Sequence, residues 1–188
     1  LASSAASDVY KRQDKLQKSY RFIDLIFGTH NIFKFAELLC RMFESSGMVI
    51  DIWKDSDQIV EDLPVERKYP FKSGINIMFG CNNFCTYCII PYARGRVRSL
   101  PPERVLAELR DLAAQGYREV VLSAISLPSY GLDTGTNLVE LVEHCAQVEG
   151  IERIRLGSLD PDMLTPEYIT RLAAVDKLCP QYLSLIHI

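Results

Sequence analysis

The chain of 188 residues lacks any hydrophobic run near the roughly 18 consecutive apolar residues that a membrane-spanning helix needs. It also lacks an excess of one charge, since 21 basic residues stand against 24 acidic ones and leave a net charge of −3. A protein that coats nucleic acid through bulk charge is therefore excluded, whereas local basic patches are not. Residues 1–13 contain no apolar segment of the kind that a secretory signal peptide carries. We therefore predict a cytoplasmic protein without a membrane partner.

The six cysteines do not indicate a disulfide framework, because disulfides persist mainly in secreted proteins and no secretion signal is present. Three of them are scattered through apolar surroundings, where we expect small buried hydrophobic residues: Cys40, Cys145 and Cys179. With 48% hydrophobic and 24% charged residues, the composition is that of an ordinary globular chain.

The two ends differ from the rest of the chain. Residues 1–13 are small and polar without a period, and the final LSLIHI breaks off where a strand is expected. Both resemble translated adaptor sequence, so we exclude them from the fold prediction. We expect the chain to be a fragment of a longer protein.

Residues 14–69 predict the tail of one α/β domain followed by a linker. Residues 55–72 are charged, contain two prolines and show no sustained period, which is typical of a linker and places a domain boundary near residue 70. The elements expected before the linker are a buried strand over 22–27, a helix over 31–44 capped by Asn31, and a strand over 48–53.

Residues 70–186 alternate between strand and helix patterns. Strands separated by helix-length connections pair in parallel, so we predict the front part of a parallel α/β barrel or open sheet. Four strands cannot close a barrel. The expected strands are 75–79, 119–122, 151–156 and 182–185, and the expected helices are 101–115, 137–148 and 166–175.

The most informative pattern is Cys81-x-x-x-Cys85-x-x-Cys88, directly after the first of these strands. Three thiolates on one loop can surround a single metal centre. Structural zinc takes four ligands, usually as two separated pairs, and no second pair is present. A 4Fe-4S cluster held by three cysteines keeps one iron open for a substrate or cofactor. The spacing therefore favours an iron–sulfur cluster, with zinc or a chance cluster of core cysteines as alternatives.

This loop resembles the signature of the radical SAM superfamily. Over residues 80–96, Gly-Cys-Asn-Asn-Phe-Cys-Thr-Tyr-Cys-Ile-Ile-Pro-Tyr-Ala-Arg-Gly-Arg, it is similar to the tRNA methylthiotransferases, and the resemblance covers about residues 20–182. It implies a partial (β/α) radical SAM barrel, preceded by the tail of an α/β methylthiotransferase domain. It further implies a 4Fe-4S cluster on Cys81, Cys85 and Cys88, with S-adenosylmethionine at the open iron.

The activity that this resemblance implies is the addition of a methylthio group to C2 of a modified adenosine next to the anticodon. The partners would be tRNA and a reductant such as flavodoxin or ferredoxin. The alternatives are a zinc-stapled nucleic-acid-binding module and an inactive truncated or chimeric barrel fragment.

Three further residues match cofactor-binding positions of the family. Tyr87 corresponds to the aromatic residue near the adenine of S-adenosylmethionine, with plain packing as its alternative. Ser158 follows the third strand, where barrel enzymes present ligand-binding groups, with a turn serine as its alternative. Ala124 stands where the family has a glycine near the methionine moiety, so its methyl group is expected to crowd the cofactor. A local basic run that could meet tRNA phosphates or the cofactor carboxylate comprises Arg94, Arg96 and Arg98, with a solvated charged face as the alternative for Arg98.

Two branches of the family are represented in the sequence. Residues 27–31 and 75–80 look like the branch that acts on isopentenyl-adenosine. Residues 156–161 and 177–180 look like the branch that acts on threonylcarbamoyl-adenosine, which is why a chimera stays open. The family also holds a second 4Fe-4S cluster through three cysteines expected upstream of Lys18, where this sequence has none. We therefore expect that cluster only in the full-length protein.

Overall fold

The computed structural model describes residues 18–28, 30–53, 67–161 and 164–184. Their internal contacts divide the chain into two units: the described residues up to Trp53 together with the loop 81–96, and residues 67–80 together with 97–184. The predicted adaptor-like segment 1–13 and most of the predicted linker lie outside the described residues. Among the described helices, none is long and apolar enough to cross a bilayer.

The first unit contains a small parallel βαβ arrangement. Strands β1 and β2 pair in parallel, with Leu25 opposite Val49, and a helix connects them, as a parallel pair requires. The expected strand over 22–27 is only three residues long, and Phe22 is 79% exposed rather than buried. The elements are β1 (Leu25–Phe27), the 3-10 turn η1 (Ile32–Lys34), α2 (Phe35–Glu44) and β2 (Val49–Asp51).

The prediction that Asn31 caps the helix is wrong. Its buried side chain makes no capping hydrogen bond to the turn that follows. Instead, its Oδ1 accepts a hydrogen bond from the amide of Gly28 at 3.0 Å, and its Nδ2 donates to the carbonyl of Asp51 at 2.7 Å. Asn31 therefore ties the end of β1 to the end of β2.

Helix α2 buries less of its surface than its apolar spacing suggests. Leu38 is its one buried residue, whereas Phe35 is exposed. Cys40 is also exposed, so the expectation that it is a small buried hydrophobic residue is wrong. The physical reason is that a two-stranded sheet covers only a narrow stripe of a helix.

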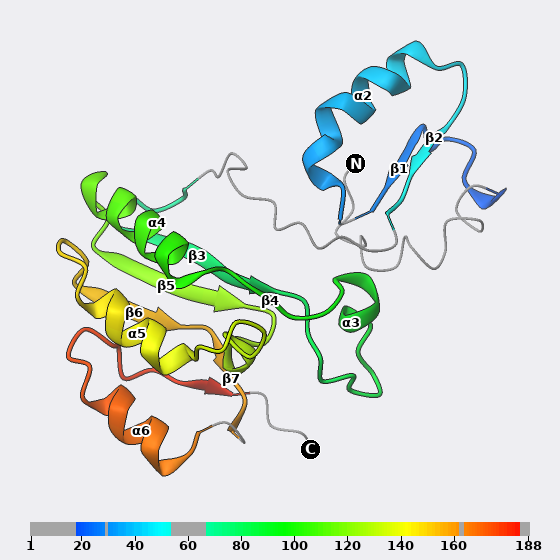
Figure 1. Ribbon diagram of the computed structural model, residues 1–188. Helices are drawn as coiled ribbons and strands as arrows, with labels where there is room; N and C mark the ends of the chain where they lie inside the picture. The colour runs from blue at the N-terminus through cyan, green and yellow to red at the C-terminus, as the bar shows by residue number, and fades with distance from the viewer. Residues whose placement is uncertain (1–17, 29, 54–66, 162–163, 185–188) are drawn as a thin grey trace. The chain divides into compact units, whose positions relative to one another are not determined.

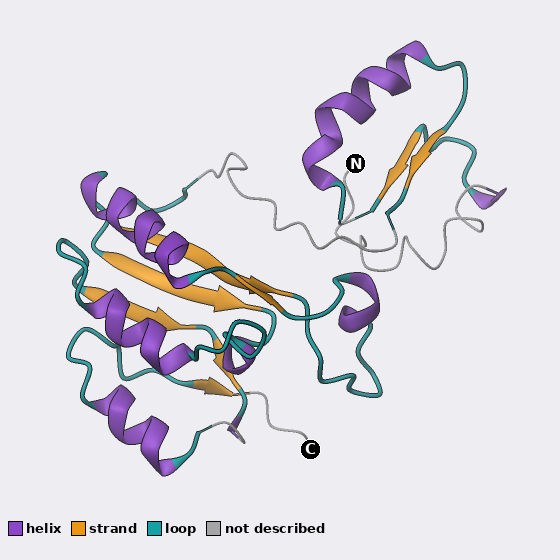
Figure 2. Ribbon diagram, viewed as in Figure 1, coloured by secondary structure: helices purple, strands orange, loops and turns teal. Residues whose placement is uncertain are grey.

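The second unit has the parallel-rich α/β sheet that the sequence predicts. Its strands lie in the order β4-β3-β5-β6, with β3, β5 and β6 parallel. Helices α4, α5 and α6 lie on one side of this sheet (Figures 1 and 2). The elements are β3 (Lys72–Phe79), β4 (Arg98–Ser99), α4 (Pro102–Ala114), β5 (Glu119–Ala124), η2 (Leu127–Ser129), α5 (Leu138–Ala146), β6 (Arg153–Leu156), β7 (Ser158–Leu159), α6 (Pro166–Ala173) and β8 (Leu183–Ser184).

Three details of this sheet differ from the prediction. Strand β3 begins at Lys72, inside the expected linker. Strand β4 pairs with β3 in antiparallel orientation. It was not predicted, because a strand of two residues is too short to show a period in the sequence. The expected fourth strand shrinks to Leu183–Ser184 and pairs with β7, while a separate parallel bridge joins Ile154 to Leu178.

The core of the second unit lies between the sheet and its helices. Helix α4 buries Val105, Leu109 and Leu112 on one stripe, and Gly116, with a φ of 94°, ends it as expected. Cys145 and Cys179 are buried, which confirms their expected role. Burial raises the pKa of the Cys145 thiol to about 12, so this thiol is inert as a nucleophile.

Glu119 carries a buried charge at the start of β5. Its two carboxylate oxygens accept hydrogen bonds from Nε of Arg153 at 2.8 Å and Nε of Arg155 at 2.7 Å. The strand register places Lys72 and Arg153 on either side of it. Burial by itself raises the pKa of this carboxyl, but the hydrogen bonds from Arg155 and Arg153 outweigh burial and hold the pKa below its ordinary value.

Because the folded-state pKa of Glu119 is depressed, its contribution to stability exists above the ordinary value of 4.5 and is lost as the pH falls below it. We expect Glu119→Gln to lower the free energy of unfolding by about 1–3 kcal/mol at neutral pH. The difference from wild type should shrink in acid, as measured by urea unfolding. Glu152→Gln, at an exposed neighbouring position, is the control and should change little. A difference that is independent of pH would contradict the assignment.

Candidate metal centre

The loop 81–96 directly follows the carboxyl end of β3 in the chain. The pairing of β3 with β5 passes from Asn76 opposite Ser123 to Met78 opposite Ala124, so Ile77 is an extra, bulged residue. Bulges bend a strand and redirect the residues that follow, and they are frequent next to functional sites. The bulge therefore sets the direction in which the chain leaves the sheet.

The base of the loop is closed by its own backbone. The amide of Cys81 donates a hydrogen bond to the carbonyl of Gly95 at 3.2 Å. Gly80 and Gly95 flank this contact with φ values of 73° and 75°, which glycine adopts without a Cβ clash. A short helix, α3 (Ile90–Ala93), forms part of the returning arm.

Phe84, between the first two cysteines, has a φ of 48° and is the one non-glycine residue with a positive φ in the described part of the chain. A bulky side chain in this region carries a strain of about 1–3 kcal/mol, which persists only when surrounding contacts hold it. Its ring has two such contacts. The guanidinium carbon of Arg96 lies 4.4 Å from the ring centroid, and the Tyr92 ring meets it edge-on at 5.5 Å and 85°.

The three cysteines differ in environment. Cys81 is buried, and its sulfur accepts a hydrogen bond from the amide of Asn83 at 3.5 Å. Cys85 and Cys88 are half-buried, and the amide of Cys88 donates to the carbonyl of Cys85 at 2.9 Å in a tight turn. All three are free thiols.

The donor set fits an iron–sulfur cluster in kind and number, because three thiols on one loop are what such a cluster takes from the chain when one iron stays open. The sulfurs are not gathered around a common point: across the described ranges, no three His, Cys, Asp or Glu side chains lie together as a metal site.

Tyr87 is the predicted cofactor-binding residue that the structure brings next to the cysteines. Its side chain is 74% exposed. Its phenol pKa is raised, first by desolvation and then by the nearby Cys85 and Cys88, with a side-chain hydrogen bond to Cys85. An exposed aromatic ring beside two candidate ligands is available for contact with a bound cofactor.

Ala124 and Ser158 both lie at the carboxyl edge of the sheet in the second unit. Ala124 is the last residue of β5, and Ser158 begins β7, where it pairs with Leu183. Both are partly exposed. The amide of Gly157 donates to the carbonyl of Leu122 at 3.0 Å, which fixes the turn between β6 and β7. This edge is where parallel α/β enzymes present ligand-binding groups.

The loop between β5 and α5, which was not predicted from the sequence, holds β4 in place through hydrogen bonds. The Ser99 hydroxyl accepts a hydrogen bond from the amide of Gly131 at 2.9 Å, and the Ser99 amide donates to Asp133 at 2.8 Å. The Tyr130 hydroxyl donates to the carbonyl of Leu100 at 2.8 Å. The Gly-Leu-Asp-Thr-Gly sequence at 131–135 is a turn signal that could have indicated this loop. Because β4 directly follows the cysteine loop, these bonds fix where the chain re-enters the sheet.

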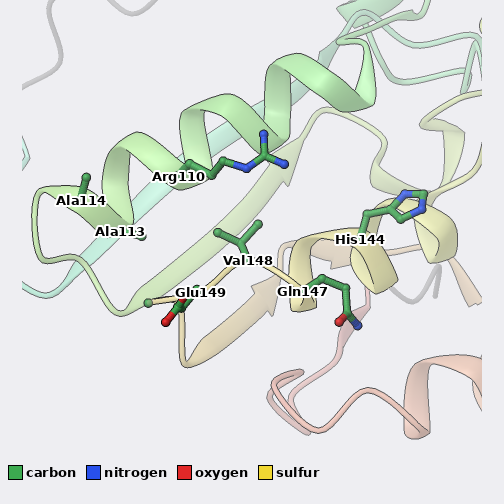
Figure 3. A pocket seen from close by; sticks show the side chains of 8 residues that line it. Arg110, Ala113, Ala114, His144, Gln147, Val148 and Glu149 are labelled. Carbon is green, nitrogen blue, oxygen red and sulfur yellow. The ribbon is translucent and has the colours of Figure 1, made fainter.

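A pocket of about 430 Å³ lies at the opposite, amino edge of the same unit (Figure 3). It is lined by the carboxyl ends of α4 and α5, including Arg110 and His144, and by residues 147–150. Both helices end there just before the next strand begins. Because enzymes of this fold place their chemistry at the carboxyl edge, this pocket is not the candidate site.

Comparison with known proteins identifies the fold family. Residues 75–184 match the radical SAM superfamily. The chain belongs to this superfamily. Membership implies a 4Fe-4S cluster and S-adenosylmethionine, which confirms the general form of the cofactor prediction.

The sequence is similar to proteins named tRNA-2-methylthio-N(6)-dimethylallyladenosine synthase. That of Lachnoclostridium phytofermentans is 49% identical over 168 residues, which is 88% of this chain and 37% of the relative. That of Alkaliphilus oremlandii is 44% identical over 170 residues, covering 89% and 36%. That of Thermoanaerobacter pseudethanolicus is 43% identical over 168 residues, covering 88% and 36%. These relatives confirm the resemblance to the tRNA methylthiotransferases, and the chain spans little more than a third of their length.

Among solved structures, the radical S-adenosylmethionine methyltransferase TsrM from Kitasatospora setae, with cobalamin and a 4Fe-4S cluster bound, aligns with a TM-score of 0.45. The alignment has 23% identity and covers 54% of this chain and 20% of TsrM.

Proposed function

We propose that this chain is the cluster-binding part of a radical SAM tRNA methylthiotransferase that acts on C2 of N6-dimethylallyladenosine. The observation that carries the proposal is the loop with Cys81, Cys85 and Cys88, which lies within the superfamily match and within the 49% identity to a relative of that name. Dimethylallyl is another name for the isopentenyl group. The long similarity to relatives of one kind supports this branch and an undivided origin of the chain.

In this proposal, the three cysteines hold the 4Fe-4S cluster. The cluster supplies, when bound, the electron that cleaves S-adenosylmethionine reductively, which is chemistry that side chains cannot perform. The chain's own residues bind the cluster and orient the cofactor. The Asn83 amide donates to the Cys81 sulfur, and hydrogen bonds to cluster sulfurs are one means by which a protein tunes the potential.

Tyr87 contacts the cofactor adenine beside the cysteines, while Ala124 and Ser158 contribute cofactor contacts from the carboxyl edge. The domain tail occupies residues 14–69 and the barrel portion residues 70–186. The full protein has tRNA as its substrate, a flavodoxin or ferredoxin as reductant, and a second 4Fe-4S cluster that upstream cysteines would hold.

The function can be tested by grafting, because 88% of the chain aligns with 37% of the Lachnoclostridium phytofermentans relative. Residues 20–182 replace the matching segment of the Lachnoclostridium phytofermentans protein, and tRNA nucleosides are analysed by mass spectrometry after incubation under reducing conditions. We expect methylthio-dimethylallyladenosine from the graft. The same graft with Cys85→Ser is the matched control and should give none. A folded, cluster-loaded graft without product would overturn the proposal.

Ala124 offers a separate test of cofactor contact at the carboxyl edge. If its methyl group crowds S-adenosylmethionine, Ala124→Gly should tighten binding about two- to fivefold, since relief of a methyl contact is worth up to about 1 kcal/mol. Binding is measured from the change that S-adenosylmethionine causes in the electron paramagnetic resonance spectrum of the reduced cluster. Equal affinity in both proteins would show that the methyl group is accommodated.

A further inference from the structure

Three side chains of the cysteine loop form one contact group, which we call the Phe84 clamp: Phe84, Tyr92 and Arg96. Phe84 is in the left-handed region with a φ of 48°. The Arg96 guanidinium carbon is 4.4 Å from its ring centroid, and the Tyr92 ring meets it edge-on at 5.5 Å. Tyr92 lies in α3 and Arg96 at the end of the loop, so the clamp joins the outgoing arm to the returning arm.

Phe84 separates Cys81 from Cys85, and its backbone conformation therefore sets the relative direction of the first cysteine and the Cys85–Cys88 turn. A residue with a Cβ returns to the negative-φ side unless contacts hold it. The ring contacts of Phe84 can hold its positive φ, because a cation over an aromatic face and an edge-on ring are both attractive to the Phe84 ring.

We propose that Arg96 is a positioning residue for the cysteine loop: through the Phe84 ring it holds the left-handed turn that sets the direction of Cys81 relative to the Cys85–Cys88 turn, so that rotation of the three side chains can bring their sulfurs to one cluster. This inference rests on the proposed function and assigns Arg96 a role other than contact with tRNA phosphate or the cofactor carboxylate. Arg96 acts through Phe84 and touches neither sulfur nor substrate in this role.

The clamp lies at the surface, where Arg96 is exposed and Phe84 is 37% exposed. Exposed cation–π contacts contribute little free energy. Loss of the guanidinium is therefore expected to lower the occupancy of the left-handed Phe84 conformation about two- to fivefold. Loss of the ring removes the contacts with both Arg96 and Tyr92, and the expected change is about tenfold.

The experiment compares the wild-type chain with Arg96→Ala, Phe84→Leu and Phe84→Tyr, with Arg110→Ala on the exposed face of α4 as a matched control. Each protein is reconstituted anaerobically with iron and sulfide, and the loss of cluster absorption after addition of a chelator is followed in time. We expect faster loss in Arg96→Ala and Phe84→Leu by the factors above. Phe84→Tyr keeps an aromatic face and should lose its cluster at the wild-type rate, as should Arg110→Ala.

A second readout needs no cluster. Amide hydrogen exchange of residues 81–96 in the metal-free chain should be faster in Arg96→Ala and Phe84→Leu, while the amides of β5 keep their protection. A general loss of stability would raise exchange in both places and contradict a positioning role.

The outcomes separate the two proposals. If the wild-type chain takes up no iron–sulfur cluster, the proposed function fails, whatever the variants do. If the wild type takes up the cluster and Arg96→Ala loses it at the wild-type rate, the clamp proposal fails and the function stands. If Arg96→Ala or Phe84→Leu does not fold, the amide exchange rates of Phe84→Tyr still test the clamp proposal. Faster exchange of residues 81–96 in Phe84→Tyr than in wild type would contradict it.

Discussion

Replacement of Cys81, Cys85 or Cys88 by serine, one at a time, is expected to abolish iron–sulfur binding. A thiolate is a soft, readily deprotonated ligand, whereas a serine hydroxyl keeps its proton at neutral pH and binds iron weakly. Three cysteines are the minimum set from this loop, so no spare thiol can compensate. Iron and sulfide should fall from about four of each per chain to near zero, and the broad absorption near about 400 nm should vanish.

Cys40→Ser is the matched control for these three substitutions. Cys40 is exposed on α2, so the substitution leaves no buried hydroxyl and should preserve full iron and sulfide content. Cys145 is a poorer control because its thiol is buried and a hydroxyl there would be buried too. Equal metal content in the loop variants and wild type would refute the assignment. One zinc per chain in colourless wild-type protein would favour the zinc-stapled module.

The second unit could be predicted in outline because its signals are local. Helix α5 starts where Asn137 stands, and the structure shows the Asn137 side chain accepting a hydrogen bond from the amide of Glu140 at 3.0 Å. Proline and an acidic residue begin α4, and Gly116 ends it. Such signals lie within a few residues of the helix or strand whose ends they mark, so a single sequence reveals them.

The errors lie where distant segments decide the outcome. Asn31 has the side chain of a helix cap but bonds to Asp51, twenty residues away. Strand β4 exists because Ser99 meets Met78 and is braced by Asp133. Two-residue strands such as β7 and β8 carry no period, and pairing alone defines them. Tertiary contacts of this kind leave no trace in local spacing.

The same distinction between local signals and tertiary contacts applies to the candidate site. The cysteines could be read from the sequence because ligand spacing within one loop is local. The left-handed conformation of Phe84 and its contact with Arg96 could not, because aromatic and basic residues are compatible with many loop conformations. The sequence predicts that Arg96 meets tRNA phosphates or the cofactor carboxylate, and the structure adds a contact of its guanidinium with the Phe84 ring that no spacing indicates.

Gly131→Ala is expected to cause the largest loss of stability outside the cysteine loop. A Cβ at this position would lie 2.3 Å from the carbonyl oxygen and 2.4 Å from the carbonyl carbon of Thr136, and the φ is 84°. Both obstacles are backbone, which cannot rotate away as a side chain can. We expect the free energy of unfolding to fall by about 3 kcal/mol or more in urea titrations, because strain and a steric clash add.

Gly135→Ala isolates the steric part of this effect. Gly135 lies in the same turn with a φ of 78°, but a Cβ there would meet nothing within 4 Å. Its substitution should cost about 1 kcal/mol, the ordinary penalty for a left-handed residue with a side chain. If both variants lost the same stability, the close approach to Thr136 would not matter. If Gly131→Ala alone is severe, the turn must shift, and the hydrogen bond from the Gly131 amide to Ser99 is the first contact that this shift would break.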